Sequence, residues 1–179
     1  MNKDQIFSEL LPRYQHFSET VSGLPEADFL YAAPGKWSSA QQLDHVRKSV
    51  KPLVLALRLP KFVLKLFFGT ANRPSKSYDE LVQKYQSKLK QALTPPAAFR
   101  PETIAFQNRT ELSKNVIQTV HRLTKALETW SEEDLDRYIL PHPLLGKITV
   151  REMMYFTIYH AEHHEKLVQF YLAERPKAS

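Results

Sequence analysis

The chain has 179 residues, a length typical of one domain, and we predict a single domain over residues 1–179. It has no cysteine, which excludes disulfide bonds, cysteine-ligated zinc and cysteine nucleophiles. The net charge of +6 marks a basic protein, but neither a helix-turn-helix signature nor interleaved aromatic and basic residues are visible, so we expect no nucleic-acid partner. Residues 1–15 lack the apolar segment of a secretory signal, and we expect a cytoplasmic protein.

Glycine is scarce, with four residues, and no segment alternates apolar and polar residues as a half-buried strand would. This pattern predicts an all-α fold. The most apolar segment, residues 51–69, is interrupted by Arg58, Pro60, Lys61 and Lys65. It is too polar to cross a bilayer as one helix, and we expect no membrane contact.

The first predicted helix covers residues 2–22, where apolar residues recur at helical spacing. The second begins after Ser38, which can form a capping box with Gln41. Pro52 lies inside this second helix and is expected to kink or break it. The apolar stripe of the second helix consists of Leu43, Val46, Val50, Leu53 and Leu57.

The remaining helices follow in the second half of the chain. A capping box at Ser77 begins a short helix, and a long amphipathic helix begins near residue 108. The proline-rich residues 139–147 are predicted to be a connection. The last helix begins with a capping box formed by Thr149 and Glu152. Four long helices predict a four-helix bundle, with an extra short helix in a long middle connection.

The last helix carries three histidines in the segment TIYHAEHHEKLVQFYL, residues 157–172. His160 and His164 are one turn apart on the apolar face, which places their Cβ atoms about 6 Å apart and lets both imidazoles bind one ion. His163 lies about 60° from His160 around the helix axis, on the side away from His164, and we place it near the site. The alternative is a pair of half-buried structural histidines, and the spacing alone leaves both interpretations open.

His45 is the candidate for a third ligand. It lies seven residues after Ser38, and His160 lies eleven residues after Thr149, so both are at mid-bundle depth. The alternative is a boundary histidine that makes one hydrogen bond. Two other metal patterns are excluded: Val168 stands where a HExxH zincin needs histidine, and no glutamate has a histidine three residues later, as a di-iron bundle requires. What remains is a mononuclear site.

The segments GKWSSAQQLDHVRKS, HPLLGKITVREMM and HAEHHEKLVQ follow one another in an order that resembles the DinB/YfiT-like superfamily, especially its DinB-like branch. The resemblance implies a four-helix bundle whose metal is held by one histidine of the second helix and two of the last, here His45, His160 and His164. It implies a metal site more directly than a reaction. Residues 52–106 form a longer insertion than such a bundle needs, so no substrate preference is implied.

Three neutral imidazoles and an open position suit a divalent Zn, Ni or Fe ion. The resemblance favours a thiol-dependent S-transferase that joins a low-molecular-weight thiol to a small-molecule substrate. A metal-dependent hydrolase and a non-catalytic metal- or ligand-binding bundle remain as alternatives. Transfer ranks above hydrolysis because Glu162 and Glu165 are predicted to point away from the ligand face, leaving no carboxylate to deprotonate a water molecule.

Other residues are assigned to the surroundings of the site. His142 and Lys147, in the loop before the last helix, are candidates for its mouth, and Trp37 is predicted to pack over the start of the second helix. The basic residues 47–90 form either a solvated basic face or a field that attracts an anionic substrate, acidic lipid or nucleic acid, and the sequence leaves their role open. The apolar residues 53–68, together with the resemblance, predict a homodimer.

Overall fold

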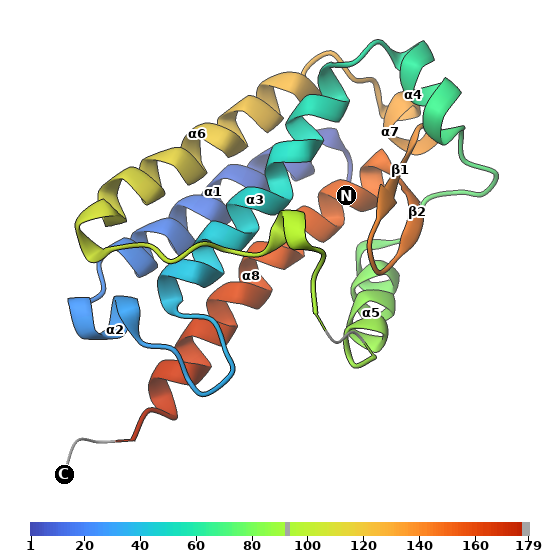
Figure 1. Cartoon of the computed structure of the whole chain (residues 1–179). Helices are drawn as coiled ribbons and strands as arrows, with labels where there is room; N and C mark the ends of the chain where they lie inside the picture. Colours follow the sequence, from blue (N-terminus) through green and yellow to red (C-terminus); the bar gives the residue numbers. More distant parts are fainter. Residues whose placement is uncertain (92–93, 177–179) are drawn as a thin grey trace.

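Four long helices form a bundle in the computed structural model, which describes residues 1–91 and 94–176 (Figure 1). They are α1 (Lys3–Ser22), α3 (Ser39–Arg58), α6 (Arg109–Leu127) and α8 (Val150–Ala173). Helices α1 and α3 each contact both α6 and α8, so the four helices enclose one shared core. The predicted all-α four-helix bundle is therefore confirmed, with one small hairpin added to it.

The long helices begin where the sequence places their capping boxes. Ser38 and Gln41 cap α3, and the Thr149 hydroxyl accepts the backbone N–H of Glu152 at the start of α8. Because apolar residues recur every three or four positions, each helix buries one face. Fully buried core side chains include Leu10, Phe17, Leu43, Val46, Val116, Leu123 and Met154.

Shorter elements connect the long helices. They are α2 (Glu26–Leu30), α4 (Lys61–Phe68), α5 (Tyr78–Leu89), α7 (Glu132–Arg137) and the single-turn 3-10 helices η1 (Ala97–Phe99) and η2 (Phe106–Asn108). The extra short helix predicted in the middle connection is α5, which packs on α8. Helix α4 was not predicted. Among the described helices, none is both long and apolar enough to cross a membrane.

Pro52 does not break α3, which runs as one helix from Ser39 to Arg58. The predicted break at this residue is wrong. Pro52 is exposed, so water can hydrate the carbonyl that loses its hydrogen bond. Val50 and Leu57, on either side of it, are buried in the core and hold the two halves of the helix in place.

Residues 139–147, predicted to be a connection, contain a β-hairpin instead. Strand β1 (Ile139–His142) pairs antiparallel with β2 (Gly146–Thr149), and His142 lies opposite Gly146. Gly146 has φ of +75°, a conformation that glycine adopts at little cost. The hairpin packs on α4 and leads directly into α8, so it places His142 beside the helix that carries His160.

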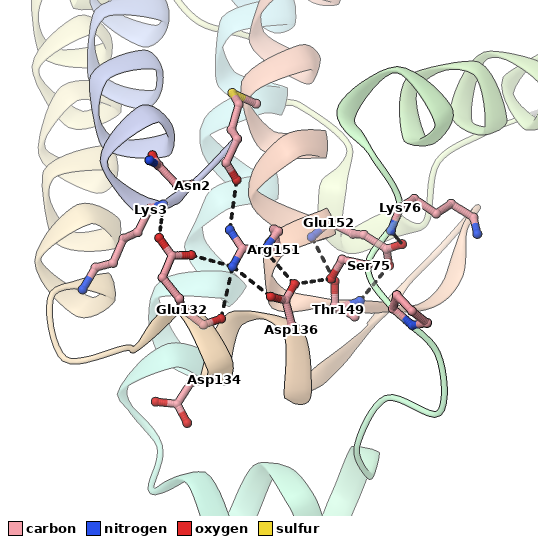
Figure 2. A network of polar contacts seen from close by, with 12 residues as sticks. Asn2, Lys3, Ser75, Lys76, Glu132, Asp134, Asp136, Thr149, Arg151 and Glu152 are labelled. Atoms are coloured by element: carbon pink, nitrogen blue, oxygen red, sulfur yellow. Dashed lines mark hydrogen bonds and ion pairs between the residues drawn. The ribbon is translucent and has the colours of Figure 1, made fainter.

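Arg151 anchors the start of α8 to the short helix α7 (Figure 2). Its guanidinium donates to Glu132 Oε2 at 2.5 Å and to Asp136 Oδ1 at 2.6 Å. It also donates to the Met1 carbonyl at 2.9 Å, which ties the N-terminus to the same point. Several bonds to one planar guanidinium fix its geometry better than a single exposed ion pair would.

Glu152, the next residue, is completely buried and binds the segment before α5. Its carboxylate accepts two bonds from Arg73, at 2.7 and 2.8 Å, and one from the backbone N–H of Lys76 at 2.8 Å. Burial opposes ionisation of this carboxyl and is the largest single influence, but the bonds from Arg73, Lys76 and Thr149 together outweigh it, and the pKa of Glu152 lies below its usual value. The first turn of α8 is therefore held from two sides.

Candidate metal centre

The three predicted ligands come together between α3 and α8. His45 comes from α3, and His160 and His164 come from α8; one ring nitrogen of each lies within 4.8 Å of the other two. The Nε2 atom of His160 is 3.3 Å from Nε2 of His45 and 3.0 Å from Nε2 of His164. All three side chains are buried. The two histidines one turn apart on α8 and the histidine of α3 therefore meet in the structure, as the sequence predicted.

Two carbonyl groups orient the outer ligands. The Nδ1 atom of His45 is 2.6 Å from the backbone carbonyl of Phe99 in η1, and Nδ1 of His164 is 2.5 Å from Oε1 of Gln42. A carbonyl oxygen only accepts, so each Nδ1 carries the proton. The Nε2 lone pairs of His45 and His164 therefore both point toward His160. Acceptors of this kind behind a histidine are usual in metal sites.

The three Nε2 atoms share two close contacts but at most one proton. His160 Nε2 faces two lone pairs but can carry at most one proton, so it can donate to only one neighbour. The Nε2 lone pair of the other neighbour is then left without a donor, which is unfavourable in a buried site unless a cation binds there. The residues present therefore fit a bound cation, and neutral nitrogen donors suit Zn, Ni or Fe.

Burial keeps these imidazoles neutral. It lowers the pKa of both His160 and His164 well below the usual value, and the neighbouring histidines lower it further. Burial also lowers the pKa of His45, although the bond to Phe99 raises it in part. Neutral imidazole is the form that binds a metal ion, so protons compete weakly for this site at neutral pH.

A cavity of about 510 Å³ opens onto the cluster. All three histidines contribute to its wall, so a molecule in the cavity can reach the point at which they converge. The remaining wall is largely aliphatic and aromatic, and it includes Leu53, Tyr85, Phe99, Leu144, Phe156 and Leu167. Among the described residues that line it, Lys36 is the sole lysine or arginine and no carboxylate is present.

His142 lines this cavity and is held in one tautomer. Its Nδ1 accepts the backbone N–H groups of Leu144 and Leu145, each at 3.1 Å, so the ring proton is on Nε2. Burial, with a smaller contribution from the charge of Lys84, lowers the pKa of His142 to about 4. His142 is therefore a neutral hydrogen-bond donor at neutral pH, with no free lone pair to act as a base.

Of the two other residues that the sequence placed near the site, His163 lines the cavity and Lys147 does not. His163 lines the cavity beside the cluster, with its ring 5.9 Å from that of Tyr159 and 6.2 Å from that of Tyr85. Lys147 does not line it: its ammonium donates to the carbonyl of Phe68 at 2.9 Å, at the end of α4. The hairpin alternates its side chains, so His142 and Lys147 lie on different sides.

Trp37, Gln42 and Phe99 are site residues whose roles the sequence did not indicate. The Trp37 ring lies 4.8 Å from the His45 ring and stacks 6.4 Å from His164, so it forms a wall beside the cluster. Gln42 lies three residues before His45, on the same side of α3, which was a usable signal. Phe99 contributes a backbone carbonyl from a distant loop, for which no sequence signal exists.

The two glutamates beside the ligands turn toward α1. Glu165 accepts from Thr20 at 3.2 Å and lies 3.1 Å from Nε2 of His16. Glu162 lies 3.7 Å from Nη1 of Arg13 on α1 and also accepts from Lys166 at 2.6 Å. Neither glutamate lines the cavity, so the orientation predicted for them is confirmed.

The fold and the cluster define a helical bundle with a buried three-histidine site that opens onto an apolar cavity. Comparison with protein families adds one finding: the DinB superfamily model matches residues 11–168, most of the chain. The protein therefore belongs to the DinB superfamily, as the resemblance predicted. No curated protein and no solved structure matches the chain significantly.

Proposed function

We propose that this protein is a metal-dependent enzyme that acts on a small molecule bound in the apolar cavity. His45, His160 and His164 would hold one divalent ion. The observation that carries the proposal is the convergence of three neutral Nε2 atoms that cannot satisfy one another without a cation. When bound, such an ion supplies positive charge that stabilises a thiolate or polarises a carbonyl or water.

The chain's own residues define what the substrate must offer. The aliphatic and aromatic walls exclude water and favour an apolar body. The Nε2–H of His142 can donate to an oxygen of the substrate, and its tautomer is fixed before binding. Lys36 gives the cavity one positive charge for an anionic group.

Thiol transfer is the reaction that the site supports best. The sulfur of a low-molecular-weight thiol would bond to an electrophilic carbon, the leaving group would depart with the electron pair of its bond, and the thiol proton would pass to solvent. Hydrolysis needs a base for the attacking water, but no carboxylate lines the described cavity and His142 is a donor. His163 is the one lining residue outside the cluster that favours the hydrolase alternative.

Metal content tests the site independently of activity. Wild type and the matched control His163→Ala should each retain about one divalent ion per chain by elemental analysis, whereas His160→Ala and His164→Ala should lose it. Equal loss in all three variants would mean that the assigned ligands are wrong.

Turnover distinguishes the reactions. The assay uses an electrophilic reporter with a panel of thiols, with and without metal, in wild type and His160→Ala. Thiol-dependent turnover that the variant loses supports transfer. Ester or amide cleavage without thiol, also lost in the variant, would favour hydrolysis. Metal binding without metal-dependent turnover would favour a non-catalytic bundle.

A further inference from the structure

Exposed apolar side chains are concentrated on α4 and the residues just before it. Five of the seven large apolar side chains that are exposed in the described residues come from this one stretch. We call this stretch the α4 surface; its members are Leu55, Leu59, Phe62, Leu66 and Phe67. The last three are each at least 70% exposed. A group of exposed apolar side chains on one stretch usually marks a surface that binds a protein, a membrane or another ligand.

The geometry of α4 explains the exposure. At 100° per residue, the three exposed side chains Phe62, Leu66 and Phe67 lie within an outward arc of about 140° around the helix axis. Leu64 lies outside this arc and is completely buried. Helix α4 therefore rests on the protein through Leu64 and presents a second apolar face to the outside. A helix that only covered its own core would carry polar residues there.

The α4 surface is also cationic. Residues 46–78 contain eight lysines and arginines and no acidic residue. Arg58 and Lys65 are exposed within the surface, and Lys51 is exposed one turn before Leu55. Four of the eight basic residues are neutralised by ion pairs. Arg47 and Lys48 bind Asp44, and Arg73 binds Glu152. The Lys61 ammonium is bonded to Asp134 and lies 5.4 Å from the Trp130 ring. The apolar side chains are thus flanked by cations that have no acidic neighbour in sequence.

Helix α7 carries four acidic residues and reaches α4 through the pair of Asp134 with Lys61, but each of the four already has a cationic partner. Asp134 is bonded to Lys61, and Glu133 lies 3.9 Å from Arg137. Glu132 and Asp136 both bind the Arg151 guanidinium, as Figure 2 shows. Within residues 1–91 and 94–176, Arg58 and Lys65 therefore have no ion-pair partner, and the surface keeps its positive potential.

Charge decides between the two candidate occupants. In a twofold dimer through this surface, the same patch of both copies would meet. This would bring Arg58 and Lys65 of both copies into one interface to which residues 46–78 contribute no carboxylate. An anionic lipid surface instead offers phosphates to the cations and an acyl region to the aromatic rings. We propose that the α4 surface binds an anionic membrane peripherally, with Phe62, Leu66 and Phe67 inserted at the interface.

This proposal is independent of the proposed function of the histidine site. It departs from the expectation of no membrane contact, which rested on the absence of a spanning segment. A short amphipathic helix that lies in the interface needs no such segment. It also gives part of the basic region 47–90 a partner other than the substrate.

Vesicle flotation of the full chain tests the proposal. We expect binding to phosphatidylcholine vesicles containing roughly one third phosphatidylglycerol, weak binding to phosphatidylcholine alone, and release by salt. The triple variant Phe62→Ser, Leu66→Ser, Phe67→Ser should lower the partition coefficient by roughly tenfold or more. Lys65→Gln should lower it about fivefold. All four side chains are exposed, so the fold should be unchanged by circular dichroism.

Phe170→Ser is the matched control, because Phe170 is 57% exposed on α8, outside the α4 surface. It should bind as wild type does. Failure of wild type to bind anionic vesicles would overturn the proposal, as would wild-type binding by the triple variant or an equal loss in Phe170→Ser. If sedimentation shows a dimer that the triple variant dissociates, and vesicles do not bind, the predicted homodimer occupies this surface instead.

Discussion

His142 predicts a specific pH dependence of stability. Burial lowers its folded-state pKa to about 4, from an ordinary value of 6.5. Between these two values the unfolded chain binds a proton at this residue and the folded chain does not. The folded state is therefore disfavoured as the pH falls below 6.5, and the loss is complete near the folded-state pKa.

The size of the effect follows from the two pKa values. At pH 5, protonation of unfolded His142 lowers the free energy of unfolding by about 2 kcal/mol relative to neutral pH. The variant His142→Asn removes this titration and retains an acceptor near the Nδ1 position for the N–H groups of Leu144 and Leu145. The stability difference between variant and wild type should therefore shift by about 2 kcal/mol in favour of the variant on acidification.

Urea unfolding of the metal-free protein at pH 7.5 and pH 5 measures this shift. The three clustered histidines are present in both proteins, so their contribution largely cancels in the difference. His121→Asn, at an exposed position on α6, should show no comparable shift. A difference between His142→Asn and wild type that stays constant to within about 0.5 kcal/mol would refute the buried, neutral state of His142.

Two further substitutions test the supports of the site. Gln42→Leu removes the acceptor of the His164 Nδ1–H. It should weaken metal affinity roughly 10–100-fold in a chelator competition, with the fold retained. Unchanged affinity would exclude this orienting role of Gln42. Arg73→Gln leaves the fully buried Glu152 carboxylate without its cation and should lower the free energy of unfolding by about 3–5 kcal/mol in urea. The double variant with Glu152→Gln should recover part of that loss, and no recovery would show that Arg73 acts through other contacts.

The helices could be predicted because their signals are local. A capping box such as Thr149 with Glu152 and an apolar stripe are properties of neighbouring residues, and the structure reproduces both. The hairpin at residues 139–149 was missed because its strands are four residues long and contain Pro141. Such short strands form through contacts with α4 and α8 rather than through their own propensity.

The site residues also differ in whether a local sequence signal identifies them. His160 and His164 are visible in the sequence because one helical turn separates them, and His45 was a candidate because it lies at a comparable depth on another helix. The partner of His45 is not visible in the sequence, since Phe99 acts through a backbone carbonyl that any residue would provide. Trp37 was placed correctly near the start of α3, but its contact with His164 depends on how α3 and α8 pack.

The two histidines on the buried face of α8 are explained by the polar partners around them. An imidazole is costly to bury alone, but His164 has an acceptor in Gln42 at Nδ1 and its Nε2 lone pair points at a shared centre. His160 sits between two such lone pairs and cannot satisfy both with one proton. A stripe of leucines at these positions would stabilise the bundle at least as well. The cluster is thus a poor solution for an apolar core and a good one for a cation, and that contrast is the strongest physical argument for the metal.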